Sequence, residues 1–138
     1  GIGMAAAFAA GADGIQMGTR FVSSLESPVH ENFKGAIVNG SEQGTYILNK
    51  KAKPCIRALK TELTDKIYEE GLMDMSALSG IKDLYFGGDM NAAPALAGQS
   101  IGLINEVLPV EQIIKQTMQE FNSVCESLSN SKFELWKF

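Results

Sequence analysis

The residues with the clearest chemical potential lie in Asp13-Gly14-Ile15-Gln16-Met17-Gly18-Thr19, near the start of the 138-residue chain. A short strand that ends in Gly18-Thr19 would present two consecutive backbone N–H groups and a hydroxyl, a concave donor set suited to a phosphate dianion. Gly18 would leave room for the approaching oxygen, and Thr19 can donate both its N–H and its O–H. On spacing alone, an ordinary tight turn after a strand explains the same residues.

The other polar residues that could do chemistry fit structural roles better. Arg20 either balances the charge of a bound anion or pairs with a surface carboxylate. His30 is the only histidine, and we expect it to cap or pack against a helix rather than to catalyse a reaction. Asp13 and Asp89 are expected in caps or turns. One histidine without clustered cysteines or carboxylates predicts no metal site.

The composition is that of a globular protein, with 45% hydrophobic and 20% charged residues. A net charge of -4 argues against a nucleic-acid partner, which needs a basic stripe. Lys50-Lys51-Ala52-Lys53 is expected to be a solvated loop. No segment approaches the run of about 18–20 apolar residues that crosses a membrane, so no membrane partner is expected.

The two cysteines and the first residues bear on the setting of the chain. Cys55 and Cys125 have neither a C-x-x-C nor a zinc spacing, so we expect two buried free thiols in a reducing compartment and a cytoplasmic protein. The chain opens with Gly1-Ile2-Gly3-Met4, without an initiator methionine and already inside an expected helix. We therefore expect the C-terminal part of a longer protein.

The elements expected around the Gly18-Thr19 turn form half of an α/β repeat. Residues 3–10 are alanine-rich, which predicts a helix, and Gly11 is a typical helix stop. The stretch 13–17, bounded by glycines, predicts a buried strand. A single strand with unpaired edges cannot form a barrel.

The rest of the chain is expected to be mostly helical. Ser27 is the expected N-cap of a helix that carries Phe33 and Ile37 on one face. Residues 45–48 predict a strand or extended segment. Residues 54–60 are expected to lead into another helix, with Leu63 and Ile67 in register.

The C-terminal region predicts one long amphipathic helix from Pro109. Its apolar face is expected to contain Val110, Ile113, Ile114, Met118, Phe121, Cys125 and Leu128. Residues 129–138 are expected to form a loose tail in which Phe133, Trp136 and Phe138 could dock.

Several ordered motifs resemble the nitronate monooxygenase (2-nitropropane dioxygenase) family and the flavin-dependent enoyl-acyl-carrier-protein reductases of the same superfamily. The motifs are residues 11–21 (GADGIQMGTRF) after a G-x-A-A-A helix, 26–34 (ESPVHENFK), 56–60 (IRALK) and 97–104 (AGQSIGLI). Together they cover about residues 1–120.

This resemblance implies an FMN site. Gln16, Met17, Gly18 and Thr19 would contact FMN at the end of the eighth barrel strand. Gln99 could hydrogen-bond the flavin, the phosphate or the cofactor-bearing loop. The alternative for its segment is helix packing through the small residues Gly98 and Gly102. The family's Gly-Gly phosphate turn and its catalytic histidine would lie upstream of Gly1, so no catalytic residue is assigned in the chain.

The fold implied is α/β, the C-terminal portion of a (β/α)8 TIM barrel plus a mostly helical C-terminal segment. Residues 1–60 would end the FMN-binding barrel (helix 7, strand 8, helix 8), residues 61–128 would form the helical segment, and residues 129–138 the tail. The partners expected are a small-molecule substrate and either a second copy, as a homodimer, or the N-terminal part of the barrel.

Three functions stay open. The first is an FMN-dependent oxidoreductase of the nitronate monooxygenase type, which oxidises alkyl nitronates with dioxygen. The second is an enoyl-acyl-carrier-protein reductase that uses FMN and NAD(P)H as co-substrate. The third is a non-catalytic fragment that needs the N-terminal part of the barrel.

Overall fold

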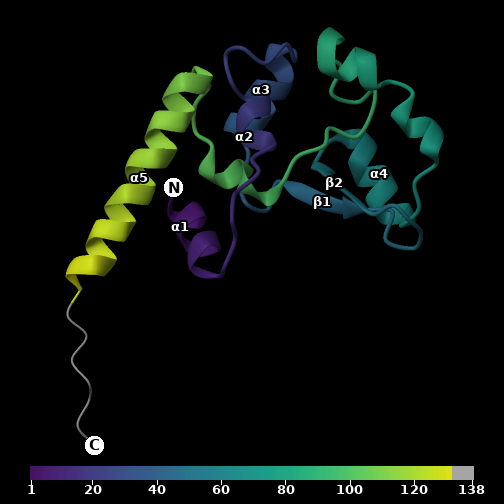
Figure 1. Cartoon of the computed structure of the whole chain (residues 1–138). Helices are drawn as coiled ribbons and strands as arrows, with labels where there is room; N and C mark the ends of the chain where they lie inside the picture. The colour runs from purple at the N-terminus through teal and green to yellow at the C-terminus, as the bar shows by residue number, and fades with distance from the viewer. Residues whose placement is uncertain (132–138) are drawn as a thin grey trace, which may run out of the picture. The chain divides into compact units, whose positions relative to one another are not determined.

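The computed structural model describes residues 1–131, which form an α/β fold of two compact units (Figure 1). Within the described residues, the first unit combines residues 1–16 with residues 110–131, and the second comprises residues 17–109. The elements in chain order are α1 (Ile2–Ala9), α2 (Thr19–Val22), α3 (Glu31–Val38), β1 (Thr45–Leu48), β2 (Ile56–Leu59), α4 (Glu62–Glu70), the 3-10 helix η1 (Met75–Leu78), the π-helical turn η2 (Asp83–Gly87), the 3-10 helix η3 (Gln99–Leu103) and α5 (Val110–Asn130).

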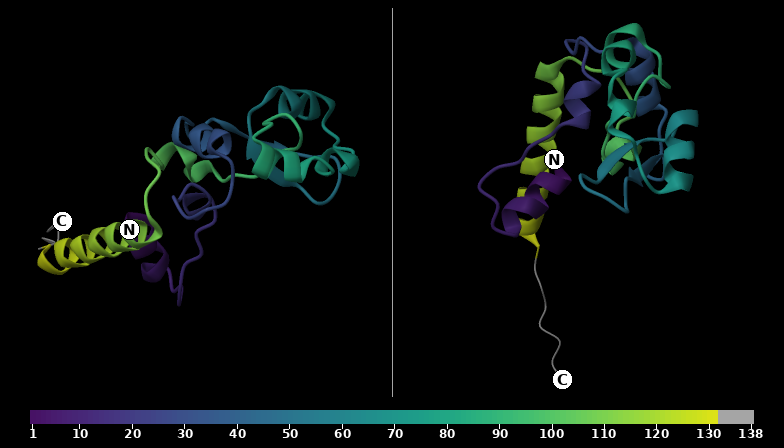
Figure 2. Two further views of the ribbon diagram at one scale, coloured as in Figure 1. Left: turned by 90° about the horizontal axis from the view of Figure 1, so that it is seen from above. Right: turned by 90° about the vertical axis from the view of Figure 1, so that its right-hand side faces the viewer.

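The first unit consists of α1 packed against α5 (Figures 1 and 2). Alanine dominates α1 and lets the two helices approach closely. The rings of Phe8 and Phe121 meet edge to face, with their centroids 5.7 Å apart. Gly11 follows α1 with a φ of +95°, which only glycine adopts readily, so the predicted stop is confirmed.

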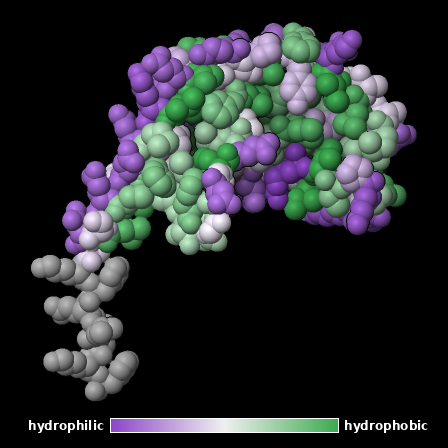
Figure 3. Space-filling model, in the orientation of Figure 1, coloured by the Kyte–Doolittle hydropathy of each residue, from purple (hydrophilic) through white to green (hydrophobic). Residues whose placement is uncertain are grey.

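The long amphipathic helix predicted from Pro109 is confirmed as α5, but little of its apolar face is covered. Ile113 is buried, whereas Ile114, Met118 and Leu128 are 48%, 41% and 57% exposed. Figure 3 shows hydrophilic residues along one side of this helix and hydrophobic residues on the side toward α1. The predicted tail lies outside the described residues from position 132 onward, including Phe133, Trp136 and Phe138.

The buried strand predicted for residues 13–17 does not form in the described chain. The segment has no ladder hydrogen bonds, and most of it is exposed, Ile15 to 40%. A strand exists only with a neighbour to satisfy its backbone groups. The sheet in the described part of the chain is β1–β2, and it does not extend to this segment.

The helix predicted after Ser27 forms, but it begins later. His30 is the N-cap of α3, with φ −59° and ψ 147°, and its Nδ1 accepts the N–H of Asn32 at 3.1 Å. The His30 N–H donates to the Tyr85 carbonyl at 2.6 Å, which keeps this residue outside the helix. Ser27 is therefore not the cap. Phe33 and Ile37 lie on the same face of α3, as predicted, and both are fully buried.

Residues 45–60 form an antiparallel pair in which β1 was predicted and β2 was not. Thr45 pairs with Leu59, and Leu48 pairs with Ile56. The segment 95–97 extends the pairing on the other edge of β2, since Leu59 N–H donates to the Ala95 carbonyl at 2.8 Å. The predicted helix with Leu63 and Ile67 follows as α4, with Thr61 and Thr64 forming a capping box.

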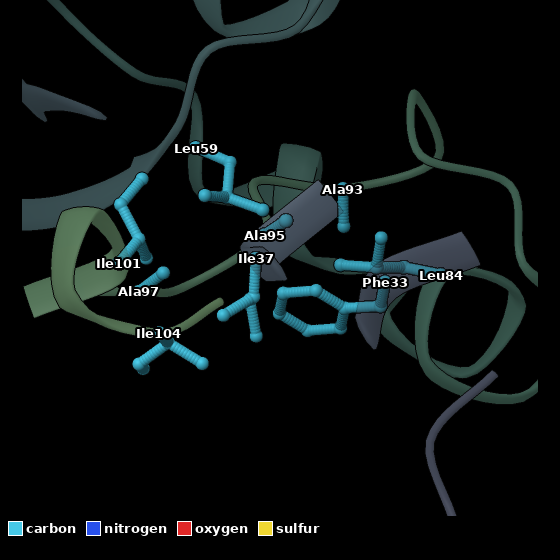
Figure 4. Close-up of a cluster of buried hydrophobic side chains, with 9 residues drawn as sticks. All are labelled: Phe33, Ile37, Leu59, Leu84, Ala93, Ala95, Ala97, Ile101 and Ile104. Carbon is cyan, nitrogen blue, oxygen red and sulfur yellow. The ribbon is translucent and has the colours of Figure 1, made fainter. Parts of the chain in front are cut away.

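The larger core of the second unit gathers side chains from α3, β2, η3 and the connecting segments (Figure 4). Phe33, Ile37, Leu84 and Ile101 are all fully buried in it. A smaller core lies between β1, β2 and α4 around Leu48. β2 contributes to both clusters, and its outer edge binds the segment 95–97, whose Ala95 and Ala97 belong to the larger cluster.

Two further expectations concern the surface. Cys55 and Cys125 are free, as predicted, but both are exposed rather than buried, since one lies in the lysine-rich loop and the other on the open face of α5. Lys50, Lys51 and Lys53 are exposed, as predicted. Across residues 1–131 the helices lack the length and apolar character that crossing a bilayer requires.

Candidate phosphate-binding site

The Gly18-Thr19 turn is the start of a short helix. Gly18 is the N-cap of α2, and its carbonyl accepts the N–H groups of Phe21 and Val22 at 3.0 Å each. Within residues 1–131, no backbone acceptor pairs with the N–H groups of Thr19 and Arg20. Such first-turn donors are satisfied by side chains, water or ligands.

The hydroxyl of Thr19 joins this turn to the second candidate segment. The Gly98 N–H donates to Thr19 Oγ1 at 2.9 Å, across 79 residues of sequence. A hydroxyl has two lone pairs and one hydrogen, so this bond fixes the oxygen and leaves its O–H free to donate. The structure thus brings together two segments that the sequence offered separately.

Gly98 is positioned by β2. Ala97 N–H donates to the Arg57 carbonyl at 3.2 Å, and Ala58 forms a bridge with Leu96. Ala95 and Ala97 are buried in the larger core. Small side chains fit there because this extended segment packs directly against the other residues of the larger core. Gly98 follows the segment directly, so the same contacts fix its position.

Thr19 is held from the other direction by the loop between η3 and α5. The Arg20 guanidinium donates to the Glu106 carbonyl at 2.8 Å and to Ser23 Oγ at 3.2 Å. Partial burial lowers the pKa of Arg20, and the negative charge of Glu106 acts in the opposite direction. Arg20 therefore braces α2 through a carbonyl and a hydroxyl, where the sequence suggested a bound anion or a surface carboxylate.

The sequence offered close packing as an alternative reason for the glycines at 98 and 102, and the structure supports it for Gly102 alone. A β-carbon on Gly102 would lie 2.7 Å from the backbone nitrogen of Glu42, so a close approach requires glycine there. A β-carbon on Gly98 would make only ordinary contacts, the nearest at 3.6 Å. Gly18 is similar, because a β-carbon added there would have nothing within 4 Å. The fold itself does not require glycine at 18 or 98.

The remaining residues predicted to contact the cofactor are exposed or only half-buried. Gln99 begins η3 directly after Gly98 and is exposed. Met17 is half-buried, and Gln16, which belongs to the first unit, is exposed. Their contacts with FMN stay predictions. The Gly98 N–H and the Ser100 hydroxyl were not singled out, because a contact across 79 residues has no local signal in the sequence.

His30 has the capping role expected for it. Its ring also packs on Gly88, where a β-carbon would clash with the imidazole and where φ is +76°. Asp89 is a turn residue, as expected, since its Oδ1 accepts the N–H of Asn91 at 2.9 Å. In the described range 1–131, no group of three or more His, Cys, Asp or Glu side chains is arranged to hold a metal ion.

Replacing His30 by alanine is expected to lower the free energy of unfolding by about 1–2 kcal/mol, because α3 loses its N-cap and some packing. His30→Asn, which keeps a capping acceptor, should recover part of this loss. Urea denaturation measures both. A loss of flavin affinity in His30→Ala without a loss of stability would contradict the capping role.

The donor set around Thr19 fits a phosphate group. It combines free backbone N–H groups, a hydroxyl fixed by Gly98 and two glycines whose side-chain positions are open. Consecutive N–H groups in a turn bind anions without a buried cation. An α/β fold with such a turn is the kind of scaffold on which proteins hold phosphorylated cofactors.

Comparison with known proteins identifies the family. Residues 1–120 match the family model described as nitronate monooxygenase, and the chain belongs to this family. A curated relative, a probable nitronate monooxygenase from Staphylococcus saprophyticus, is 26% identical over 132 residues, which cover 88% of this chain and 37% of the relative.

Two solved structures are also similar to this chain. FabK from Thermotoga maritima is 39% identical with a TM-score of 0.87, over 94% of this chain and 43% of that one. A methionine-to-alanine mutant of the same FabK is 40% identical with a TM-score of 0.82, over 94% of this chain and 41% of that one. The chain therefore spans about two fifths of the length of these relatives.

Proposed function

We propose that the protein binds FMN through its phosphate and is an FMN-dependent oxidoreductase of the nitronate monooxygenase type. The observation that carries this proposal is the hydrogen bond from Gly98 N–H to Thr19 Oγ1 at 2.9 Å. It joins two of the motifs that match the family, and it leaves the Thr19 O–H as a donor. Membership of the family supports the same reading.

In this proposal the residues of the chain bind and orient the cofactor. The N–H and O–H of Thr19 donate to phosphate oxygens, Gly18 leaves space for them, and Gln16, Met17 and Gln99 contact the cofactor. Bound FMN would supply the redox chemistry, with an alkyl nitronate as the electron donor and dioxygen as the acceptor. The resemblance to the family implies a catalytic histidine upstream of Gly1, and the only histidine of this chain, His30, caps α3. We therefore assign the catalytic base outside these 138 residues.

We further propose that the chain completes a (β/α)8 barrel. Residues 13–17, which have no strand partner in the described chain, would pair there as the eighth strand, with residues 1–60 forming the end of the barrel. Either the N-terminal part of the barrel or a second copy of the chain would be the partner. Sites of such barrels lie at the carboxyl ends of the strands, where Gly18 and Thr19 would be.

A second candidate is a flavin enoyl-acyl-carrier-protein reductase with NAD(P)H as co-substrate. The higher identity to the FabK structures, 39% and 40% against 26% for the nitronate monooxygenase, favours it. Turnover by the full-length protein, which includes the N-terminal part of the barrel, separates the two. Oxygen consumption with propionate 3-nitronate supports the first candidate, and NADH oxidation with crotonyl thioester supports the second.

A non-catalytic fragment is the remaining alternative. The visible absorption spectrum of the 138-residue chain purified alone, with FMN added and unbound flavin removed, tests it. Flavin bands at close to one FMN per chain would exclude it. Absence of flavin bands and of turnover of either substrate in the full-length protein would contradict the proposed enzyme function.

A further inference from the structure

Gly98 lies beside two hydroxyl groups. A β-carbon at this position would be 3.6 Å from Thr19 Oγ1 and 3.6 Å from Ser100 Oγ. The φ of −84° and ψ of 170° are open to any residue. Neither the backbone nor the packing of the chain therefore requires glycine here, which leaves the open side-chain position beside the two hydroxyls to be explained.

Both hydroxyls are available as donors into this space. Thr19 Oγ1 uses a lone pair for the Gly98 N–H and keeps its hydrogen. Ser100 is exposed, and its hydroxyl makes no hydrogen bond within residues 1–131. The two side chains come from α2 and η3, elements that contact each other within the second unit.

We propose that Ser100 is a second hydroxyl ligand of the FMN phosphate and that Gly98 is glycine because a phosphate oxygen occupies the space between Thr19 and Ser100. The inference rests on the proposed function and adds two residues to it. Phosphate oxygens accept several hydrogen bonds each, and bonds to charged oxygens are stronger than neutral ones. Two hydroxyls close to the same open position are a suitable arrangement for such a group.

Two substitutions in the purified protein test the assignment by comparing FMN with riboflavin, which lacks the phosphate. Flavin fluorescence quenching gives the dissociation constant for each. Ser100→Ala is expected to weaken FMN binding about tenfold, or about 1.4 kcal/mol. Gly98→Ala, whose methyl would fill the space, is expected to weaken it about tenfold or more. Riboflavin affinity should change in neither variant.

Matched controls separate this role from a structural one. Ser100→Thr keeps the hydroxyl and should keep the affinity for FMN. Ser79→Ala removes an exposed hydroxyl elsewhere, and Gly35→Ala adds a methyl where nothing lies within 4 Å. Both should bind FMN normally.

The outcomes distinguish this inference from the proposed function. If the wild-type protein prefers FMN to riboflavin but Ser100→Ala and Gly98→Ala retain that preference, the roles of Ser100 and Gly98 are wrong and the FMN site stands. If the substitutions weaken FMN and riboflavin binding equally, the residues act on the fold and the inference is wrong. A wild-type protein without any preference for FMN overturns the phosphate site and this inference together.

Discussion

Replacing Thr19 by valine is expected to weaken FMN binding about 10- to 100-fold while leaving riboflavin binding within about threefold. Valine has nearly the same shape but lacks the hydroxyl. The substitution removes one charge-assisted hydrogen bond to the phosphate. It also removes the acceptor of the Gly98 N–H, which Thr19 Oγ1 binds at 2.9 Å. The effect should therefore exceed that of Ser100→Ala.

The Thr19 prediction has two controls. Thr19→Ser restores the hydroxyl and should recover most of the FMN affinity. Thr117→Val makes the same change at a hydroxyl that donates within α5, to the Ile113 carbonyl at 2.8 Å, and should not affect FMN. Fluorescence titration measures all three variants. An unchanged affinity of Thr19→Val for FMN would show that the phosphate is bound elsewhere.

Replacing Phe33 by alanine is expected to lower the free energy of unfolding by about 3–5 kcal/mol. Phe33 is fully buried in the larger core, and its ring meets Tyr85 edge to face at 5.3 Å between centroids. The substitution leaves a cavity between α3 and the segment around Leu84 (Figure 4). Such a loss is a large part of the stability of a domain.

The matched control for Phe33 is Phe86→Ala, at a side chain that is 63% exposed. This variant should change the free energy of unfolding by no more than about 0.5 kcal/mol. Phe33→Leu, with a smaller cavity, should fall between the two and covers the case in which Phe33→Ala does not fold. Urea denaturation followed by far-UV circular dichroism measures each. Equal losses for Phe33→Ala and Phe86→Ala would contradict the described core.

The helices could be predicted from sequence because their signals are local. The alanine run of α1, the glycine after it and the three- and four-residue spacing of apolar residues in α5 are all contained within the element. The same pattern could not say how much of α5 is covered, because exposure of Ile114 depends on what lies opposite. The spacing of apolar residues shows which face of a helix is apolar, but how much of that face is buried depends on the tertiary contacts.

The errors came from contacts that local sequence does not contain. The cap of α3 is His30 rather than Ser27 because Tyr85, far along the chain, binds the His30 N–H. Residues 13–17 have strand-like composition, but no partner strand lies beside them in the described chain. β2 was missed because its pairing with β1 and with residues 95–97 outweighs a sequence that also suits the start of a helix.

Only part of the candidate site could likewise be predicted from local sequence. Gly18 and Thr19 could be recognised as anion-binding residues from their types and order alone. The link from Thr19 to Gly98 is created by the fold, through Arg20 on one side and β2 on the other. This is why Ser100, an ordinary serine in the sequence, becomes a candidate ligand only in the structure.

The account depends most on where the phosphate binds, and a crystal structure of the protein with FMN measures this directly. We predict a phosphate oxygen within about 3.2 Å of Thr19 Oγ1, with further bonds from the Thr19 N–H. Such a complex with the phosphate away from both Gly18-Thr19 and residues 98–100 would contradict the central claim.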